Sequence, residues 1–114
     1  MADVDDRKVM TQPEKVDYIL DNSCGFFGIK RGDLTINTGS RSKIWFKKRF
    51  IVAVLDEYTA CIQEEIAVLV GYRDRTNVST HLKKIKEELS GELYGCEKTK
   101  RIYNELLSYL NLPL

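Results

Sequence analysis

The sequence predicts an all-α fold, a compact bundle of about five helices. With 114 residues, the chain has the length of a single domain with one modest core. Apolar residues recur at helical spacing in several separate stretches, as they do on the buried faces of amphipathic helices. No stretch shows the strict alternation or the hairpin turn that indicates β-strands.

The first residues differ in composition from the rest. Residues 1–12 are polar and acidic without periodicity, which predicts a flexible leader ahead of one helical domain over residues 13–114. The chain has no apolar run near the ~20 residues that a membrane helix needs, and no basic-then-apolar start like that of a signal peptide. We therefore expect a cytoplasmic protein without a membrane partner.

A first helix is expected from Pro13 to Ser23 or Phe27. Thr11 and Glu14 have the spacing of a capping box, in which two residues satisfy each other's free backbone N–H groups at a helix start. Proline is tolerated in a first turn because the N–H that it lacks would have no partner there.

The middle of the chain is expected to hold a loop and one long helix. Residues 29–34 predict a turn or a single turn of helix that points apolar residues inward. Residues 36–42, INTGSRS, have the composition of a loop. A long helix is then expected over residues 43–58, with Lys47 and Lys48 on its polar side.

The next segment predicts a helix-turn-helix over about residues 62–90. A short apolar helix would run to Val70, and Gly71 would end it in the usual role of a C-terminal glycine. After the turn, a second helix is expected to begin at Asp74 or Arg75. A helical hairpin of another kind could share this pattern, so the second helix carries most of the argument.

That second helix has two distinct faces. One is a narrow stripe expected to be buried, and it consists of Val78, Leu82, Ile85 and Leu89. The opposite face carries Thr76, Thr80, Lys83, Lys84 and Glu87. A helix that reads a major groove needs short hydrogen-bonding side chains near its N-terminus and cations beside them, as this face has. A last amphipathic helix is expected over residues 97–110.

Basic residues are segregated along the chain, although the formal net charge is only +1. One group is Arg41, Lys43, Lys47, Lys48 and Arg49. The other is Arg73, Arg75, Lys83, Lys84 and Lys86. A nearly neutral protein can still present one basic face to a polyanion such as DNA. Charge runs of this kind also occur simply as solvated surfaces of mixed charge.

The sequence offers no residue set for catalysis or for metal binding. The three cysteines are far apart and odd in number, which indicates reduced thiols rather than a zinc site or a disulfide framework. His81, the only histidine, lies beside the apolar stripe and is expected to be a packing residue. No nucleophile with a base, no paired acids and no glycine-rich phosphate loop are present. We expect no enzyme and no cofactor.

Residues 71–78, GYRDRTNV, resemble a signature of the C-terminal DNA-binding domain of the bacterial replication initiator DnaA. In that family the run reads GGRDHTTV and begins the recognition helix. Upstream, the aromatic pair, glycine and Asp-Leu of residues 26–34 resemble the corresponding family segment. The basic loop and the long helix follow in the same order, and the similarity extends over about residues 14–110.

The resemblance implies a helix-turn-helix fold related to the Trp repressor, which binds double-stranded DNA. The recognition helix would enter the major groove, and Arg41 of the basic loop would enter the adjacent minor groove. Asp74 and Thr76 match base-contacting positions of the signature, Asn77 stands where its second threonine is expected, and Arg75 replaces its histidine. The residues expected to contact the DNA backbone are Lys43, Lys47, Lys48, Thr80, Lys83 and Lys84.

Two departures from the signature alter what it implies. Arg75 in place of histidine should favour guanine, through O6 and N7, or a phosphate. Tyr72 in place of the second glycine could stiffen the turn or stack on the sugar-phosphate backbone. The chain also lacks the ATPase domain of full-length initiators, so ATP-driven initiation by this chain alone is not expected. A role in replication initiation or its regulation, with the chain near the nucleoid and binding as a monomer, fits the resemblance best.

Several residues of the signature have a simpler structural role open to them. Asp74 could cap the second helix by accepting a backbone N–H from two or three residues on, rather than contact a base. Thr76 and Asn77 could be solvated residues of a helix start. The whole domain could also be a protein-interaction or transcription-regulator module derived from a DNA binder, with Trp45 and Phe46 as an exposed docking surface.

Overall fold

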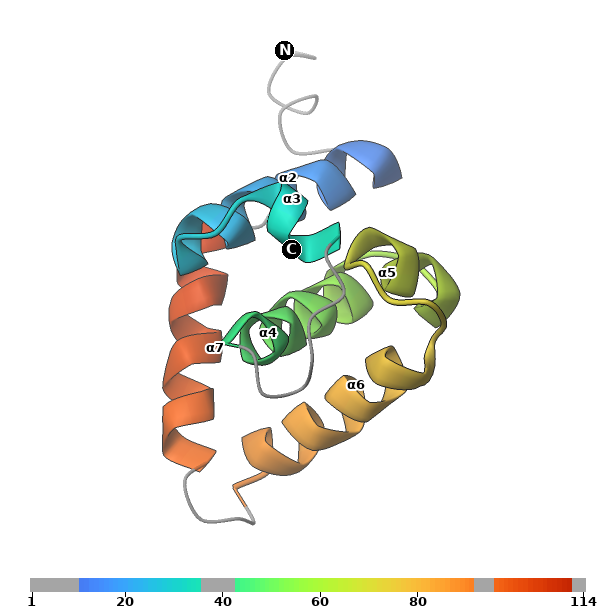
Figure 1. Ribbon diagram of the computed structural model, residues 1–114. Helices are drawn as coiled ribbons and strands as arrows, with labels where there is room; N and C mark the ends of the chain where they lie inside the picture. The colour runs from blue at the N-terminus through green and yellow to red at the C-terminus, as the bar shows by residue number, and fades with distance from the viewer. Residues whose placement is uncertain (1–10, 36–42, 92–95, 112–114) are drawn as a thin grey trace.

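The computed structural model describes residues 11–35, 43–91 and 96–111, and within these residues every regular element is a helix (Figure 1). The helices are α2 (Gln12–Phe27), α3 (Arg31–Thr35), α4 (Lys43–Tyr58), α5 (Gln63–Leu69), α6 (Thr76–Leu89) and α7 (Cys96–Leu110). The prediction of an all-α bundle is confirmed. No helix in these described ranges is both long and apolar enough to span a membrane.

Helix α2 begins where the sequence predicts. The Thr11 hydroxyl accepts a hydrogen bond from the Glu14 backbone N–H at 3.3 Å, and the Glu14 carboxylate accepts one from the Thr11 N–H at 2.9 Å. This is the complete capping box, with Pro13 in the first turn. The helix continues to Phe27, the longer of the two expected ends, and Gly28 terminates it in the left-handed conformation.

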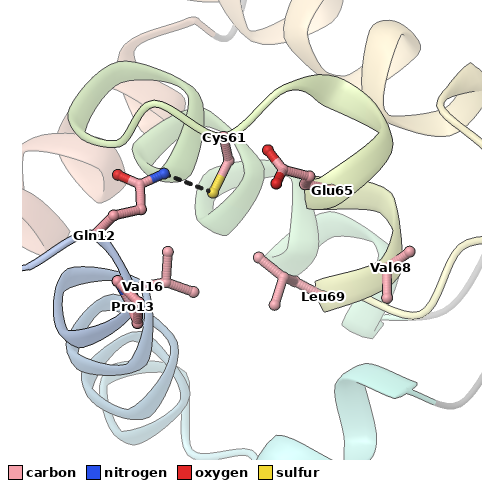
Figure 2. A pocket seen from close by; sticks show the side chains of 7 residues that line it. All are labelled: Gln12, Pro13, Val16, Cys61, Glu65, Val68 and Leu69. Carbon is pink, nitrogen blue, oxygen red and sulfur yellow. Dashed lines mark hydrogen bonds between the residues drawn. The ribbon is translucent and has the colours of Figure 1, made fainter.

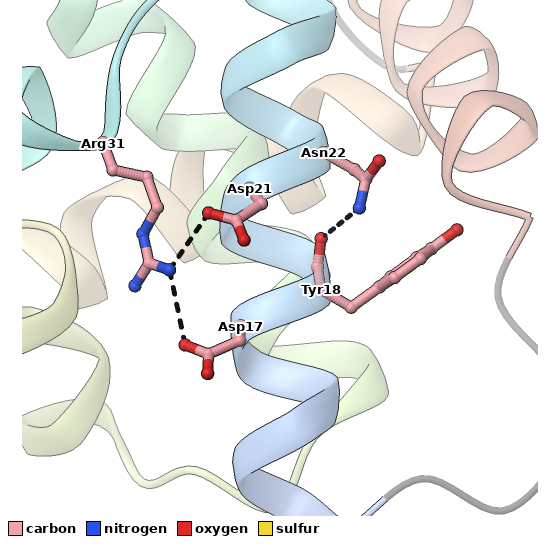
Figure 3. A network of polar contacts seen from close by, with 5 residues as sticks. All are labelled: Asp17, Tyr18, Asp21, Asn22 and Arg31. Carbon is pink, nitrogen blue, oxygen red and sulfur yellow. Dashed lines mark hydrogen bonds and ion pairs between the residues drawn. The ribbon is translucent and has the colours of Figure 1, made fainter.

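One arginine of the short helix α3 forms ion pairs with two acidic residues of α2 (Figure 3). Asp17 and Asp21 lie one turn apart on α2, so the Arg31 guanidinium reaches both, at 3.3 Å and 3.1 Å. All three side chains are largely exposed, and such pairs contribute at most about 1 kcal/mol. Leu34, which is buried, supplies the apolar contact that anchors α3.

Helix α4 runs through the centre of the molecule, with α2, α3, α5 and α6 packed around it (Figure 1). Every residue from Phe50 to Leu55 is buried, so this part of the helix has no polar side. The expectation that Lys48 lies on a polar side of α4 is wrong, because Lys48 is fully buried. One buried face was inferred from spacing, but a central helix is covered all round.

Helices α5 and α6, joined by residues 70–75, lie where the sequence predicts a helix-turn-helix, and α6 begins at Thr76, slightly later than expected. Gly71 ends the first helix with a φ of +79°, and its N–H bonds to the Val68 carbonyl oxygen. A Cβ atom at this position would lie 2.7 Å from the Thr35 Cα atom and closer still to the Leu34 carbonyl oxygen. The turn therefore requires glycine at position 71 for two reasons, its positive φ and its close contact with the backbone of α3.

Helix α6 buries the stripe that its spacing predicts. Val78, Leu82 and Ile85 are buried and Leu89 is half-buried. Helix α7 packs against α6 and α2, and the Thr99 hydroxyl donates to the Glu88 carboxylate of α6 at 3.0 Å. The core is thus one cluster shared by all the helices.

Candidate nucleic-acid interface

The face of α6 opposite the buried stripe is open to solvent. Its exposed residues are Thr76, Thr80, Lys83, Lys84 and Glu87. Arg73 and Arg75, which precede the helix, are exposed as well. Two hydroxyl groups near the N-terminus and a cluster of cations beyond them therefore share one surface, as the sequence predicts.

Asp74 lies just before Arg75, the N-cap residue of α6, and bonds to the first turn. One oxygen of its carboxylate accepts a hydrogen bond from the Thr76 backbone N–H at 2.9 Å. This bond, followed by a hydrogen bond from the Thr76 side chain, lowers the pKa of the Asp74 carboxyl below its usual value, and the charges of Arg73 and Arg75 lower it further. The bond considered from the sequence, to a backbone N–H two residues on, is present, although the N-cap residue itself is Arg75. The Asp74 side chain remains exposed.

The hydroxyl groups and the amide of the first two turns are engaged to different degrees. Thr80 donates its hydroxyl hydrogen to the Thr76 carbonyl oxygen at 3.0 Å, so donation to a phosphate would require this hydrogen to turn away from that carbonyl. Ser79 donates to the Gln63 side chain at 2.6 Å and thereby links α6 to α5. Asn77 is half-buried beside the exposed face.

Arg75 reaches across to α5. Its Nε atom lies 3.7 Å from a carboxylate oxygen of Glu64, in the first turn of that helix. Both side chains remain more than half exposed, at 63% and 62%. The sequence alone gave no sign of this pair, because the two residues belong to different helices.

The basic start of α4 contributes less surface than its sequence suggests. Lys43 is exposed, but Lys47 is half-buried and donates to the Phe27 carbonyl oxygen at 3.2 Å, where it caps the C-terminal end of α2. Lys48 is buried and Arg49 is mostly covered. Lys48 cannot contact a DNA phosphate from its place in the core. Arg41 lies outside the described residues.

Beneath the exposed face, a buried polar cluster joins α4, the turn and α6. Arg49 donates from Nε to Nδ1 of His81 at 3.2 Å, and Nε2 of His81 lies 2.7 Å from the Tyr72 hydroxyl oxygen. Because arginine can only donate, Nδ1 carries no proton, and the proton of the neutral ring is on Nε2. His81 therefore donates to the Tyr72 hydroxyl. The expectation that His81 is a packing residue is correct in part, since it also carries this network.

Electrostatics keep the cluster in one protonation state. Burial, followed by the charges of Arg49 and Lys48, lowers the pKa of His81 from 6.5 to about 4. Burial likewise raises the pKa of the Tyr72 hydroxyl and lowers that of the Lys48 ammonium. His81 is thus neutral, and Tyr72 protonated, at neutral pH.

Aromatic rings complete this cluster. The Lys48 ammonium lies 4.7 Å from the centre of the Tyr72 ring, a cation–π distance. The Trp45 ring centre lies 4.4 Å from that of His81 and 5.6 Å from that of Tyr72. Tyr72 is 5% exposed, so its expected stacking on a sugar-phosphate backbone is not possible in this structure. Its ring packs against Trp45 and His81 instead, and the other role considered for it, stiffening of the turn, stays a prediction.

Comparison of the chain with models of protein families, with curated proteins and with solved structures found no match. What the exposed face of α6 can bind must therefore be argued from the residues of this chain. This surface combines an anchored helix, exposed hydroxyl groups at the helix start, and five exposed cations, which are Arg73, Arg75, Lys83, Lys84 and Lys86.

A second surface feature lies between the start of α2 and α5, a shallow pocket of about 400 Å³ (Figure 2). Its lining residues are Gln12, Pro13, Val16, Cys61, Glu65, Val68 and Leu69. Val68 is 73% exposed, and Ile62 at the start of α5 is 60% exposed. Sequence reasoning missed this site, because single apolar residues on a short helix give no clear signal.

Proposed function

We propose that this chain is a sequence-specific double-stranded DNA-binding domain in which α6 enters the major groove. The strongest support for this proposal is the exposed face of α6, with Thr76 at its N-terminus and Lys83 and Lys84 further along. Base edges would be read by the exposed Asp74, Arg75 and Thr76 and by the half-buried Asn77. Lys43, Lys83 and Lys84 would contact phosphates.

The buried cluster supports this proposal by fixing the angle of α6. Phosphate contacts set the orientation of a DNA-binding helix, but specific readout also requires that the helix itself be rigidly held. His81 ties the middle of α6 to Arg49 of α4, and Tyr72 ties the same ring to the turn. Gly71 pins that turn against α3.

The resemblance to the DnaA C-terminal domain adds a biological setting to the proposal. On that basis the domain would act in the initiation of replication or its regulation, with Arg41 in the minor groove. The assignment of Lys47 to phosphates is weakened by its bond to α2, and that of Lys48 is withdrawn.

A selection from random duplex DNA, followed by anisotropy titrations of the enriched duplex, tests the proposal. We expect enrichment of one sequence, with binding that weakens steeply as salt rises. Replacing Arg75 or Thr76 by alanine should cost about 1–3 kcal/mol at that duplex and little on random DNA. Binding of every sequence with the same affinity, before and after Arg75→Ala, would exclude specific readout by α6.

The second candidate function is protein interaction, and the pocket beside α5 favours it over the aromatic residues first considered. Trp45 packs on His81 and Phe46 packs edge-on against Phe50, so neither forms an exposed docking surface. At the pocket, Val68 and the carboxylate of Glu65 suit a partner segment with an apolar side chain beside a lysine or arginine. Loss of a partner's binding in Val68→Lys, with duplex binding intact, would support this function.

A further inference from the structure

Arg75 stands at the start of α6, and among the described residues its guanidinium forms an ion pair with Glu64, while the charge of Asp74 also lies nearby. The Nε atom faces Glu64 at 3.7 Å, and the Arg75 side chain is otherwise largely open to solvent. The two residues bridge the two helices of the helix-turn-helix at the end that would meet the groove.

This arrangement suits the recognition of guanine. A guanidinium is a planar fork with one N–H on Nε and two on each terminal nitrogen. A carboxylate beside Nε leaves the two terminal nitrogens free, and guanine presents two acceptors, O6 and N7, to such a pair in the major groove. We propose that Glu64 is a positioning residue that orients Arg75 to read guanine. The inference rests on the DNA-binding function proposed above and names the base that this residue reads.

Glu64 is well placed for this role because the first turn of α5 is itself held. The Glu65 carboxylate accepts a hydrogen bond from the Ile62 N–H at 2.9 Å, which closes the start of the helix. Gln63 accepts the hydroxyl of Ser79 at 2.6 Å, which fixes α5 against α6. The carboxylate thus extends from an anchored turn toward the base-reading end of α6.

The same carboxylate weakens unspecific binding. An acid beside Arg75 offsets its charge and repels phosphates, so a noncognate duplex gains less from this arginine. At a cognate guanine, the oriented Arg75 guanidinium forms two hydrogen bonds to the base, and these offset the binding free energy lost through the Glu64 charge. An exposed ion pair adds little to folding, so Glu64 should change selectivity and leave the unfolding transition in place.

The test uses the duplex enriched by the wild-type domain, with each guanine replaced in turn by 7-deazaguanine, which lacks the N7 acceptor. At one position we expect wild-type affinity to fall about tenfold. Glu64→Gln should reduce that penalty about threefold and raise affinity for random duplex at low salt. In an Arg75→Lys background the N7 penalty should be small, and Glu64→Gln should then change it no further.

Glu105→Gln is the matched control, because it removes the same charge from an exposed position on α7. It should leave the N7 penalty at the wild-type value. If Glu64→Gln keeps the full penalty, or raises affinity for all duplexes equally, Glu64 only screens Arg75 and the inference fails while the DNA-binding function stands. If the wild-type domain does not retain any duplex at low salt, both fail together.

Discussion

Protonation of His81 should link the stability of the domain to pH. The ring is fully buried between Arg49, which donates to Nδ1, and the Tyr72 hydroxyl. Its pKa is lowered to about 4 in the folded protein, against 6.5 for the ordinary side chain. Between these values the unfolded chain binds more protons than the folded one. The free energy of unfolding must therefore fall as the pH falls through this window.

The magnitude follows from the two pKa values. Each unit of difference corresponds to about 1.4 kcal/mol. The histidine contributes nothing to the pH dependence near pH 8, where the ring is neutral in both states, and its effect reaches about 2 kcal/mol near pH 5 and about 3 kcal/mol near pH 4. A protonated Nδ1 would also lose the bond from Arg49, since both groups would then be donors.

Urea unfolding followed by circular dichroism, from about pH 8 to about pH 4, measures this effect in the wild type and in His81→Gln. The carboxylates are the same in both proteins, so the difference between the two pH profiles isolates the histidine. We expect the variant to be less stable at neutral pH but to lose about 2 kcal/mol less between about pH 8 and about pH 5. Two parallel profiles would refute the buried neutral ring.

Three further predictions, two of them with a matched control substitution, test other parts of the structure. Gly71→Ala should cost about 3 kcal/mol or more in urea unfolding, because the new Cβ meets the α3 backbone at a positive φ, whereas Gly32→Ala, in open space, should cost under about 1 kcal/mol. Tyr72→Phe should cost about 1–2 kcal/mol, because it leaves the buried Nε2–H of His81 without its acceptor; an unchanged midpoint would argue against that hydrogen bond. Lys84→Gln should lower the slope of log affinity against log salt by about 1, whereas Lys48→Met should leave that slope unchanged, and an equal drop in both would place Lys48 at the DNA surface.

The sequence predicted those elements whose signals are local. The capping box of Thr11 and Glu14 and the terminating role of Gly71 depend on residues a few positions apart, and both are confirmed. The buried stripe of α6 follows from residue spacing, because α6 is an amphipathic helix that packs only one face against the core. The bond that the Asp74 carboxylate accepts from the Thr76 N–H belongs to the same class.

Long-range packing decided the rest. The unbroken apolar run from Phe50 to Leu55 indicates that this part of α4 is covered on all sides. A helix covered in this way can also bury Lys48, which lies just before the run. The pairing of Tyr72 with His81, and of Arg75 with Glu64, depends on the angle between helices, which spacing along one helix does not encode. Sequence reasoning therefore found the exposed face of α6 but not the residues that hold it.

Trp45 is the only tryptophan of the chain, and its ring packs on His81 of α6. Its fluorescence is therefore a built-in optical signal for the orientation of α6, without any attached dye. Protonation of the neighbouring imidazole, or a shift of α6 upon ligand binding, would change the emission of this one ring. The protein thus carries its own spectroscopic probe at the junction of its central helix and its candidate recognition helix.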